Sequence, residues 1–284
     1  MTEIRGAASR RIRGASAMIL DMDGTIVLGD ATSGAHKALP GAIELLARLR
    51  LRGIPFRVFT NGTAKTPAVY AAGLRHAGFD IADSEMMTPS TSAAEWFVRR
   101  GIRCVRVLGL DGVQAPLRES GLNVVGPFES AGGIQAVYTG WFREFTFASL
   151  ETACSDIWAG ASLTTASDVP FFATQNGRAI GTSFAINAMI RALTGKRARV
   201  LGKPARAVID CALRQMGLRT SDVVRTIVVG DDPTLEMRMA NAARAFGVAV
   251  TTGLNDAAAF KAGPKAERPH AVISSLYPLL KALG

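Results

Sequence analysis

The chain has 284 residues, of which 48% are hydrophobic and 20% are charged, so it can bury a large core and is not expected to be disordered. No apolar run approaches the roughly 18–20 residues that a membrane-spanning helix needs. Lys and Arg total 33 against 23 Asp and Glu, a net charge of +10, but no basic run exceeds two residues and none is interleaved with aromatics. We therefore expect neither a membrane nor a nucleic acid as a partner.

The cysteines are too few and too scattered for a disulfide framework or a structural zinc site. Cys104, Cys154 and Cys211 are odd in number and contain no C-x-x-C pair. We predict buried, reduced thiols, and a reducing cytoplasm is the default location. The arginine-rich N-terminus lacks the apolar stretch of a secretory signal. An organellar transit peptide is the alternative for this segment, but Glu3 and the short length favour a solvated tail.

The first 90 residues alternate between strand and helix patterns. The sequence predicts a buried strand over residues 17–20, a helix over 41–52, a second strand over 56–59 and a second helix over 64–76. Strands that alternate with helices in this way are typical of a parallel sheet covered by helices on both faces.

The middle of the chain, from about residue 90 to 195, starts this rhythm again. Strands are predicted over 105–108 and 136–139, and helices over 150–158 and 183–193. This is enough sequence for a layered domain of its own, and we interpret it as an insertion into the first pattern.

The first pattern is expected to resume at residues 200–201. A helix over 206–216, a strand over 226–229, a helix that ends near residue 245 and a strand over 248–250 follow. The predicted fold class is therefore α/β, with a Rossmann-like, doubly wound parallel sheet as the core and an inserted α/β domain.

Four polar clusters follow the carboxyl ends of predicted strands or start a helix. They are residues 21–25 (DMDGT), 60–62 (TNG), 202–204 (GKP) and 230–232 (GDD). In open α/β sheets, ligands bind outside the carboxyl ends of the strands, so residues distant in sequence can meet at one site. Each cluster alone is a common turn. Together they offer carboxylates for a hard cation, a hydroxyl and backbone amides for an anion, and one ammonium group.

In this order, the four clusters resemble the four motifs of the haloacid dehalogenase superfamily of aspartyl-nucleophile phosphatases, and the resemblance covers nearly the whole chain. The insertion between the second and third motifs is similar to a type II cap, as in p-nitrophenyl, nucleotide, sugar, phosphoglycolate and pyridoxal phosphate phosphatases (class IIA). The resemblance implies a catalytic core of residues 1–90 and 195–284. It implies a cap of residues 91–194 that sets specificity and can carry dimer contacts.

The resemblance also implies the role of each acid. Asp21 is expected to be the nucleophile and Asp23 the general acid and base. Mg²⁺ is expected on the Asp21 side chain, the Asp23 backbone carbonyl and the Asp231 side chain, since Mg²⁺ prefers oxygen ligands.

The phosphoryl group is expected to bind in the second and third clusters. By the resemblance, the Thr60 hydroxyl and the backbone amides of Asn61 and Gly62 hold its oxygens, and Lys203 neutralises the remaining charge and orients Asp21.

Four further residues are candidates for supporting roles. Asp232 and Glu236 follow Asp231, where the family has a second acid, and Glu236 stands where the subfamily commonly has Asp. They are expected to act through a metal-bound water, or else as solvated acids at a helix start. In the cap, Asp168 and Asn176 are expected to face the substrate, or else to lie in ordinary turns.

These features predict a Mg²⁺-dependent phosphomonoester hydrolase that acts on a small phosphorylated metabolite through an aspartyl-phosphate. A homodimer is also expected. A noncatalytic relative that binds a phosphorylated ligand is the alternative, although such a module does not require both Asp21 and Asp23. A phosphotransferase or mutase is disfavoured, because its relatives carry the cap between the first two motifs, and only about 35 residues separate Thr25 from Thr60.

Overall fold

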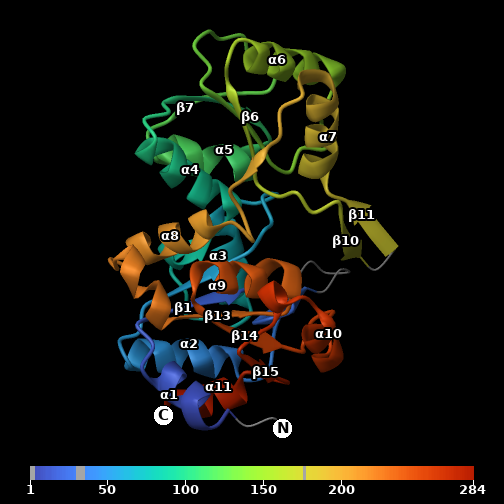
Figure 1. The fold of residues 1–284 in the computed structure, drawn as a ribbon. Coiled ribbons are helices and arrows are strands. Elements are labelled where there is room, and N and C mark those ends of the chain that lie inside the picture. The colour runs from blue at the N-terminus through green and yellow to red at the C-terminus, as the bar shows by residue number, and fades with distance from the viewer. Residues whose placement is uncertain (1–3, 30–35, 175–176) are drawn as a thin grey trace. The chain divides into compact units, whose positions relative to one another are not determined.

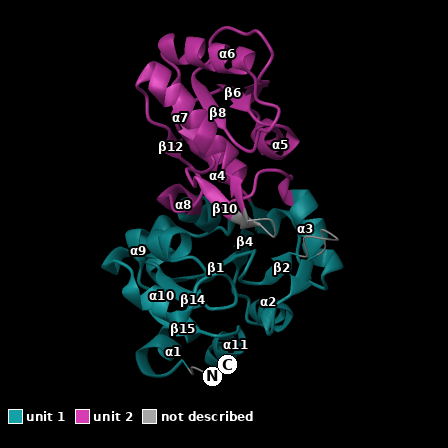
Figure 2. Ribbon diagram, turned by 90° about the vertical axis from the view of Figure 1, so that its right-hand side faces the viewer, with its two compact units in different colours: residues 1–60, 68–87, 209–284 teal, residues 61–67, 88–208 magenta. Residues whose placement is uncertain are grey.

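The computed structural model describes residues 4–29, 36–174 and 177–284. The chain divides into two compact units, which Figure 2 shows in different colours. Unit 1 comprises residues 1–60, 68–87 and 209–284, and unit 2 comprises residues 61–67 and 88–208. Each unit contains its own parallel sheet and is described by itself.

Unit 1 is built on a six-stranded parallel sheet in the order β15-β14-β13-β1-β4-β5. Its strands are β1 (Ala17–Asp21), β4 (Phe56–Phe59), β5 (Met86–Met87), β13 (Thr226–Gly230), β14 (Phe246–Val250) and β15 (Ala271–Ile273). The central strands β1, β13 and β14 are buried along their whole length, which suits strands covered on both faces. Between β1 and α2 in the chain, β2 (Val27–Gly29) and β3 (His36–Ala38) form a separate, short antiparallel pair.

Helices cover both faces of this sheet. The helices of this part of the chain are α1 (Gly6–Arg13), α2 (Ala42–Leu51), α3 (Pro67–His76), η1 (Asp83–Glu85), α8 (Arg206–Gln215), η2 (Thr220–Arg225), η3 (Pro233–Met237), α9 (Arg238–Ala243), α10 (Ala257–Ala262), η4 (Lys265–Glu267) and α11 (Tyr277–Leu283). One face packs against α1, α2, α3 and α11 in the largest apolar cluster, and the other packs against Met237 of η3 and Phe260 of α10.

Unit 2 has a five-stranded parallel sheet in the order β12-β9-β8-β6-β7. Its elements are α4 (Pro89–Arg99), β6 (Cys104–Leu108), α5 (Asp111–Glu119), β7 (Asn123–Val125), β8 (Ala136–Thr139), α6 (Phe147–Trp158), β9 (Ser162–Thr165), β10 (Phe171–Thr174), β11 (Gly177–Ile180), α7 (Thr182–Thr194) and β12 (Arg199–Val200). Helices α4 and α5 cover one face, and α6 and α7 cover the other (Figure 1). β10 and β11 form a separate antiparallel hairpin.

The predicted fold class is confirmed, and three elements differ from the prediction. The strand expected to resume the core, β12, instead pairs with β9 in the sheet of unit 2, because two residues carry too little pattern to specify a partner. Helix α3 begins at Pro67 rather than at residue 64, since proline suits the first turn of a helix. The helix expected after β13 starts as a π-helix, η3, before α9 follows.

The N-terminal segment is ordered where a solvated tail was expected. Residues 6–13 form α1, whose Ile12 is buried in the core of unit 1, so this apolar residue anchors the arginine-rich segment. The three cysteines are free, as predicted, but Cys104 is only half-buried. Among the described residues, no helix has the length and apolar character needed to cross a membrane.

Candidate active site

Asp21 ends the central strand of unit 1 and opens a tight loop. Its side chain is 7% exposed, and the buried Thr25 hydroxyl donates a hydrogen bond of 2.9 Å to Asp21 Oδ2. Gly24 adopts a φ of +79°, a conformation that favours glycine, and so lets the chain turn back over Met22. One oxygen of Asp21 is therefore held by the loop that follows it, which fixes the orientation of the carboxylate.

Asp23 and Thr60 approach one another at the carboxyl ends of the neighbouring strands β1 and β4. Asp21 is in register with Phe59, so Thr60 follows β4 beside the loop that carries Asp23. The Thr60 hydroxyl lies 3.5 Å from Asp23 Oδ2, at the limit of a hydrogen bond. Asp23 is exposed whereas Asp21 and Thr60 are buried, an arrangement that suits a group exchanging protons with a substrate or with water.

Asp231, at the end of β13, is packed against two glycines of neighbouring loops. A Cβ added to Gly24 would lie 2.4 Å from Asp231 Oδ2, and one added to Gly253 would lie 1.7 Å from the same oxygen. Real Cβ atoms do not approach so closely, so only glycine fits at either position while Asp231 keeps its place. The structure thus brings the carboxylate of Asp231 beside the loop that follows Asp21.

Two residues of this site were not predicted from the sequence. The Thr252 hydroxyl donates to the Gly24 carbonyl at 2.6 Å, and the Asn255 side chain donates to the Asp231 carbonyl at 3.0 Å. Both lie in the loop that follows β14, the neighbour of β13. The rule that ligand sites gather at strand carboxyl ends applies to this loop as well, and Thr-Gly-x-Asn after the predicted strand was the available signal.

Asp232 and Glu236 are held by the backbone around η3. Asp232 Oδ1 accepts hydrogen bonds from Thr234 and from the Leu235 amide, so it caps the helix. Glu236 is 2% exposed and accepts from the Asp232 amide at 3.1 Å, and a Cβ on Gly230 would lie 2.2 Å from Glu236 Cγ. The alternative of a solvated acid therefore does not describe Glu236. The Glu236 side chain folds back over Gly230, and Glu236 itself lies in the π-helix η3.

Asn61 and Lys203 meet inside unit 2. The Lys203 amide donates to Asn61 Oδ1 at 2.9 Å, and Asn61 Nδ2 donates to the Lys203 carbonyl at 3.2 Å. Gly202 is packed on Asn61 and on the carbonyl of Ala166, where a Cβ would lie 2.2 Å away. Lys203 is only 3% exposed. The second and third predicted clusters are thus joined by a reciprocal pair of hydrogen bonds.

The remaining candidates are less constrained. Asp168 is exposed in the loop between β9 and β10, Gly62 is half-buried, and Asn176 lies outside the described residues. The site residues consequently form two sets. Asp21, Asp23, Thr60, Asp231, Asp232 and Glu236 belong to unit 1, whereas Asn61, Gly62, Asp168 and Lys203 belong to unit 2.

The donor set of unit 1 suits Mg²⁺ better than a transition metal. In the part of the chain that the structure describes, no three His, Cys, Asp or Glu side chains cluster as metal ligands. Mg²⁺ is often held by one or two carboxylates and completes its shell with waters and substrate phosphate. Asp21 and Asp231 offer such a pair of hard oxygen ligands, and their loops are in contact through Gly24.

The family profile of haloacid dehalogenase-like hydrolases matches residues 18–123, and the HAD-hydrolase-like profile matches residues 200–279. Human chronophin is 27% identical over 297 residues, which covers 99% of this chain and 97% of that protein. D-glycerol 3-phosphate phosphatase of Mycobacterium tuberculosis is 29% identical, over 84% of this chain and 64% of its own length.

Solved structures of phosphatases are also similar to this chain. The glycerol phosphate phosphatase of Mycobacterium tuberculosis in complex with magnesium has a TM-score of 0.81 and 26% identity, over 95% of this chain and 77% of that one. The 4-nitrophenylphosphatase of Thermotoga maritima has a TM-score of 0.83 and 25% identity, over 96% and 99% of the two chains.

Fold, motif order and relatives together define the class of the protein. The chain belongs to the haloacid dehalogenase superfamily, in its class IIA. It is a phosphatase, and Mg²⁺ is the cofactor of phosphatases of this superfamily.

Proposed function

We propose that this phosphatase is a Mg²⁺-dependent phosphomonoester hydrolase that works through a phosphoryl group bound covalently to Asp21. The observation that carries this proposal is the contact between the first and last motifs in unit 1, where the Asp231 carboxylate lies against Gly24. Three groups with matched chemistry, Asp21, Asp23 and Asp231, thereby lie on adjoining loops at one edge of one sheet.

The first step forms the covalent bond. An oxygen of the Asp21 carboxylate attacks phosphorus, a new P–O bond forms, and the P–O bond to the leaving alcohol breaks. Asp23 in its protonated form gives its proton to the departing alkoxide, which leaves as the alcohol. Thr25 supports this step, because its hydrogen bond to Oδ2 fixes the orientation of the Asp21 carboxylate.

The second step releases phosphate. Asp23, now a carboxylate, takes a proton from a water molecule while the water oxygen bonds to phosphorus. The bond between phosphorus and Asp21 then breaks, which yields orthophosphate and the free Asp21 carboxylate. Asp23 is protonated again at the end of the cycle, so the enzyme is ready for the next substrate.

The remaining groups bind and neutralise the phosphoryl group. Thr60, the amides of Asn61 and Gly62, and the Lys203 ammonium are the proposed phosphate ligands. Asp21, the Asp23 carbonyl and Asp231 would hold Mg²⁺, which neutralises charge between an anionic nucleophile and an anionic ester. Asp232 and Glu236 support this loop through their contacts with the backbone.

The proposed substrate is a small phosphorylated metabolite. Relatives are named for glycerol phosphate, nucleotides, dihydroxyacetone phosphate and sugar phosphates, which are all small phosphomonoesters. We further propose that residues 91–194 act as the cap, that Asp168 and Asn176 contact the leaving group, and that the enzyme works as a cytoplasmic homodimer.

Hydrolysis of p-nitrophenyl phosphate tests the catalytic proposal. Wild type is compared with Asp21→Asn and with the control Asp80→Asn, which changes an exposed acid paired with Arg50 far from the motifs in sequence. We expect Asp21→Asn to lose at least about 10³-fold in kcat and the control to keep its rate. Thorough chelation of metal should abolish the wild-type rate, and added Mg²⁺ should restore it.

The covalent intermediate needs a separate readout. Wild-type enzyme quenched with acid during turnover should carry phosphate on the peptide that contains Asp21, detected by mass spectrometry. Equal rates for wild type and Asp21→Asn would overturn the nucleophile assignment. Tight binding of orthophosphate with no hydrolysis of any ester would instead support the noncatalytic alternative.

A further inference from the structure

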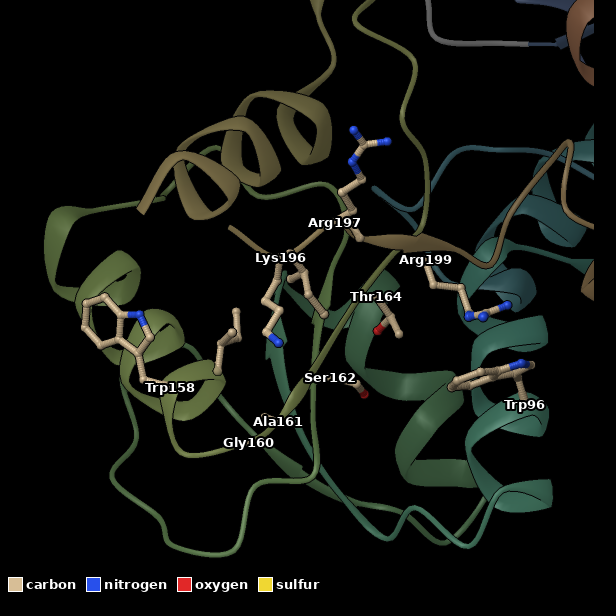
Figure 3. A pocket seen from close by; sticks show the side chains of 12 residues that line it. Trp96, Trp158, Gly160, Ala161, Ser162, Thr164, Lys196, Arg197 and Arg199 are labelled. Atoms are coloured by element: carbon tan, nitrogen blue, oxygen red, sulfur yellow. The ribbon is translucent and has the colours of Figure 1, made fainter. Parts of the chain in front are cut away.

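Unit 2 contains a pocket of about 890 Å³. It is lined by Trp96, Ile157, Trp158, Gly160, Ala161, Ser162, Leu163, Thr164, Lys196, Arg197, Ala198 and Arg199. These residues come from the end of α4, the end of α6, the start of β9 and the segment that leads into β12 (Figure 3). None of them belongs to the four motifs, and the pocket is large enough for a ligand of nucleotide size.

The lining of this pocket carries charge of one sign. Lys196, Arg197 and Arg199 lie within four residues of one another, and no acidic residue is among the described residues that line the pocket. In Figure 3, Lys196 extends into the pocket, Arg199 lies beside Trp96, and Arg197 points away from both. Like charges held this close raise the local positive potential, which a multiply charged anion would relieve.

Two tryptophan rings lie at opposite ends of the pocket. Trp96 is already engaged, with the Arg100 guanidinium 4.5 Å and the Arg199 guanidinium 5.8 Å from its ring centroid. Trp158 is 65% exposed, and it has no ring or cation partner among the described residues. An exposed indole beside a cationic cluster offers a flat apolar surface on which a planar ring can stack.

The edge of the sheet is open at the same place. Pairing of β12 with β9 begins at Arg199 and Thr164, so Ser162 and Leu163 of β9 have no β12 partner in the described ladder. An uncovered strand edge presents backbone donors and acceptors, which can bind the polar edge of a ring. The Thr164 hydroxyl is not available, because it donates to the Val137 carbonyl.

We propose that this pocket binds a multiply charged anion that carries a planar ring, of the nucleoside diphosphate class. Lys196 and Arg199 pair with the phosphates, and Trp158 stacks on the base. The three features are independent of one another, since the charge, the indole and the open strand edge come from different elements. No residue of the four motifs lines this pocket, so such a ligand would not be hydrolysed there.

The test uses ADP as the probe and the fluorescence of the full-length protein as the readout. The chain has three tryptophans, of which Trp96 and Trp158 line the pocket and Trp141 does not. Titrations are made with a chelator present, so that the Mg²⁺-dependent reaction is silent. We expect saturable quenching by ADP and weaker quenching by adenosine, because adenosine lacks the phosphates.

Charge and stacking variants locate the site. The double substitution Lys196→Glu and Arg199→Glu should weaken ADP binding by about 10-fold or more, since two charge-assisted contacts are lost. Trp158→Phe should reduce the quenching, whereas Trp141→Phe should keep it. The double substitution Lys261→Glu and Lys265→Glu, at two exposed positions of unit 1, is the matched charge control and should leave binding unchanged.

Each result decides the proposal. An absence of saturable ADP binding overturns it, and so does binding that survives the double substitution, because ADP then binds elsewhere, such as the catalytic site. Hydrolysis of p-nitrophenyl phosphate by the double variant checks that it folds. If it fails to fold, the single Lys196→Gln variant replaces it, and an unchanged ADP affinity in a folded Lys196→Gln protein would refute the assignment of Lys196.

Discussion

The two units of this phosphatase contain sheets of the same kind, but the residues that follow their strands differ. In unit 1, β1 ends at Asp21, and Thr60 and Asp231 directly follow β4 and β13. In unit 2, Gly109 and Gly140 directly follow β6 and β8. Both sheets are parallel and covered by helices on both faces. The architecture therefore provides a place for a ligand, but the residues decide whether that place is used.

Packing explains the glycines in unit 2. A Cβ on Gly109 would lie 2.3 Å from Val113 Cγ2, and one on Gly140 would lie 2.5 Å from the same atom. Val113 of α5 thus packs directly against the backbone that follows β6 and β8. In unit 2 an apolar side chain therefore covers the ends of β6 and β8, while β9 and β12 are followed by the candidate residues Asp168 and Lys203.

Of the predictions that follow, replacing the proposed proton donor Asp23 should change the hydrolysis rate most. If the rate did not change, the contrast between a catalytic sheet in unit 1 and the sheet of unit 2 would fail. Asp23→Asn should lower the hydrolysis of an alkyl phosphate by about 10²–10⁴-fold. The p-nitrophenolate group needs less protonation to leave, so p-nitrophenyl phosphate should give a burst stoichiometric with enzyme, followed by slow turnover. Rapid-mixing absorbance measurements would show it. An equal loss for both esters without a burst would contradict the role of Asp23.

Unit 2 also holds a buried charge, and its loss should affect stability rather than chemistry. The Arg106 guanidinium in β6 is fully buried and donates to Asp156 and to the carbonyls of Gly126 and Glu129. Asp156→Ala should leave this cation without its counter-ion and reduce the free energy of unfolding by about 3 kcal/mol in urea titrations.

The matched control for this change is Asp80→Ala, which removes an exposed pair with Arg50 and should cost at most about 1 kcal/mol. Folded Asp156→Ala protein should retain its kcat. A kcat loss at full folding would show that this charge takes part in the reaction, and the contrast between the two sheets would then fail.

The packing around Asp231 allows a test of whether the carboxyl end of the unit 1 sheet binds Mg²⁺. Gly253→Ala places a Cβ where the Asp231 carboxylate now lies, so that carboxylate must move. We expect the apparent Mg²⁺ affinity to fall by about 10–100-fold, measured as activation of p-nitrophenyl phosphate hydrolysis by Mg²⁺. Gly132→Ala is the control, because a Cβ there meets no atom within 4 Å. An unchanged Mg²⁺ requirement in Gly253→Ala would remove Asp231 from the proposed metal ligands.

The smallest expected effect is on the pH dependence of stability. It involves His270, which directly precedes the edge strand β15. Burial lowers the pKa of His270, and the positive charge of Arg11 lowers it further. The Gly247 amide donates to His270 Nδ1 at 3.0 Å, a bond that only the unprotonated nitrogen can accept. The folded pKa is below that of the unfolded chain, so the unfolded state binds more protons as pH falls. This contribution to stability is therefore complete above about pH 6.5 and is lost as pH falls below it.

His270→Asn should weaken this pH dependence in urea unfolding measured between neutral and mildly acidic pH. His76→Asn, at the end of α3, is the matched control and should keep the wild-type dependence. A His270→Asn protein that loses stability with acid as steeply as wild type would show that other groups cause the loss.

The sequence was sufficient for the α/β class and for most of the strands, because buried runs such as residues 17–20 and 226–229 have strong local patterns. It was sufficient for Asp21 and Asp231 as candidates, because their motifs follow those strands directly. It missed Thr252 and Asn255, whose role depends on the neighbouring strands β13 and β14. It also could not show that Glu236 folds back onto the backbone, since burial of an acid is a property of tertiary packing.

The space around Asp231 has a consequence for the history of the sequence. Positions 24, 231 and 253 share one small volume, so a larger side chain at either glycine is compatible only with a shorter side chain in place of the aspartate. Drift at these three places is consequently coupled although they lie more than 200 positions apart at the extremes. A homologue without the acid gains room for a side chain at position 253, whereas the φ of +79° at Gly24 still favours glycine there. A paired change at positions 231 and 253 would therefore mark a lineage that has given up phosphate ester cleavage.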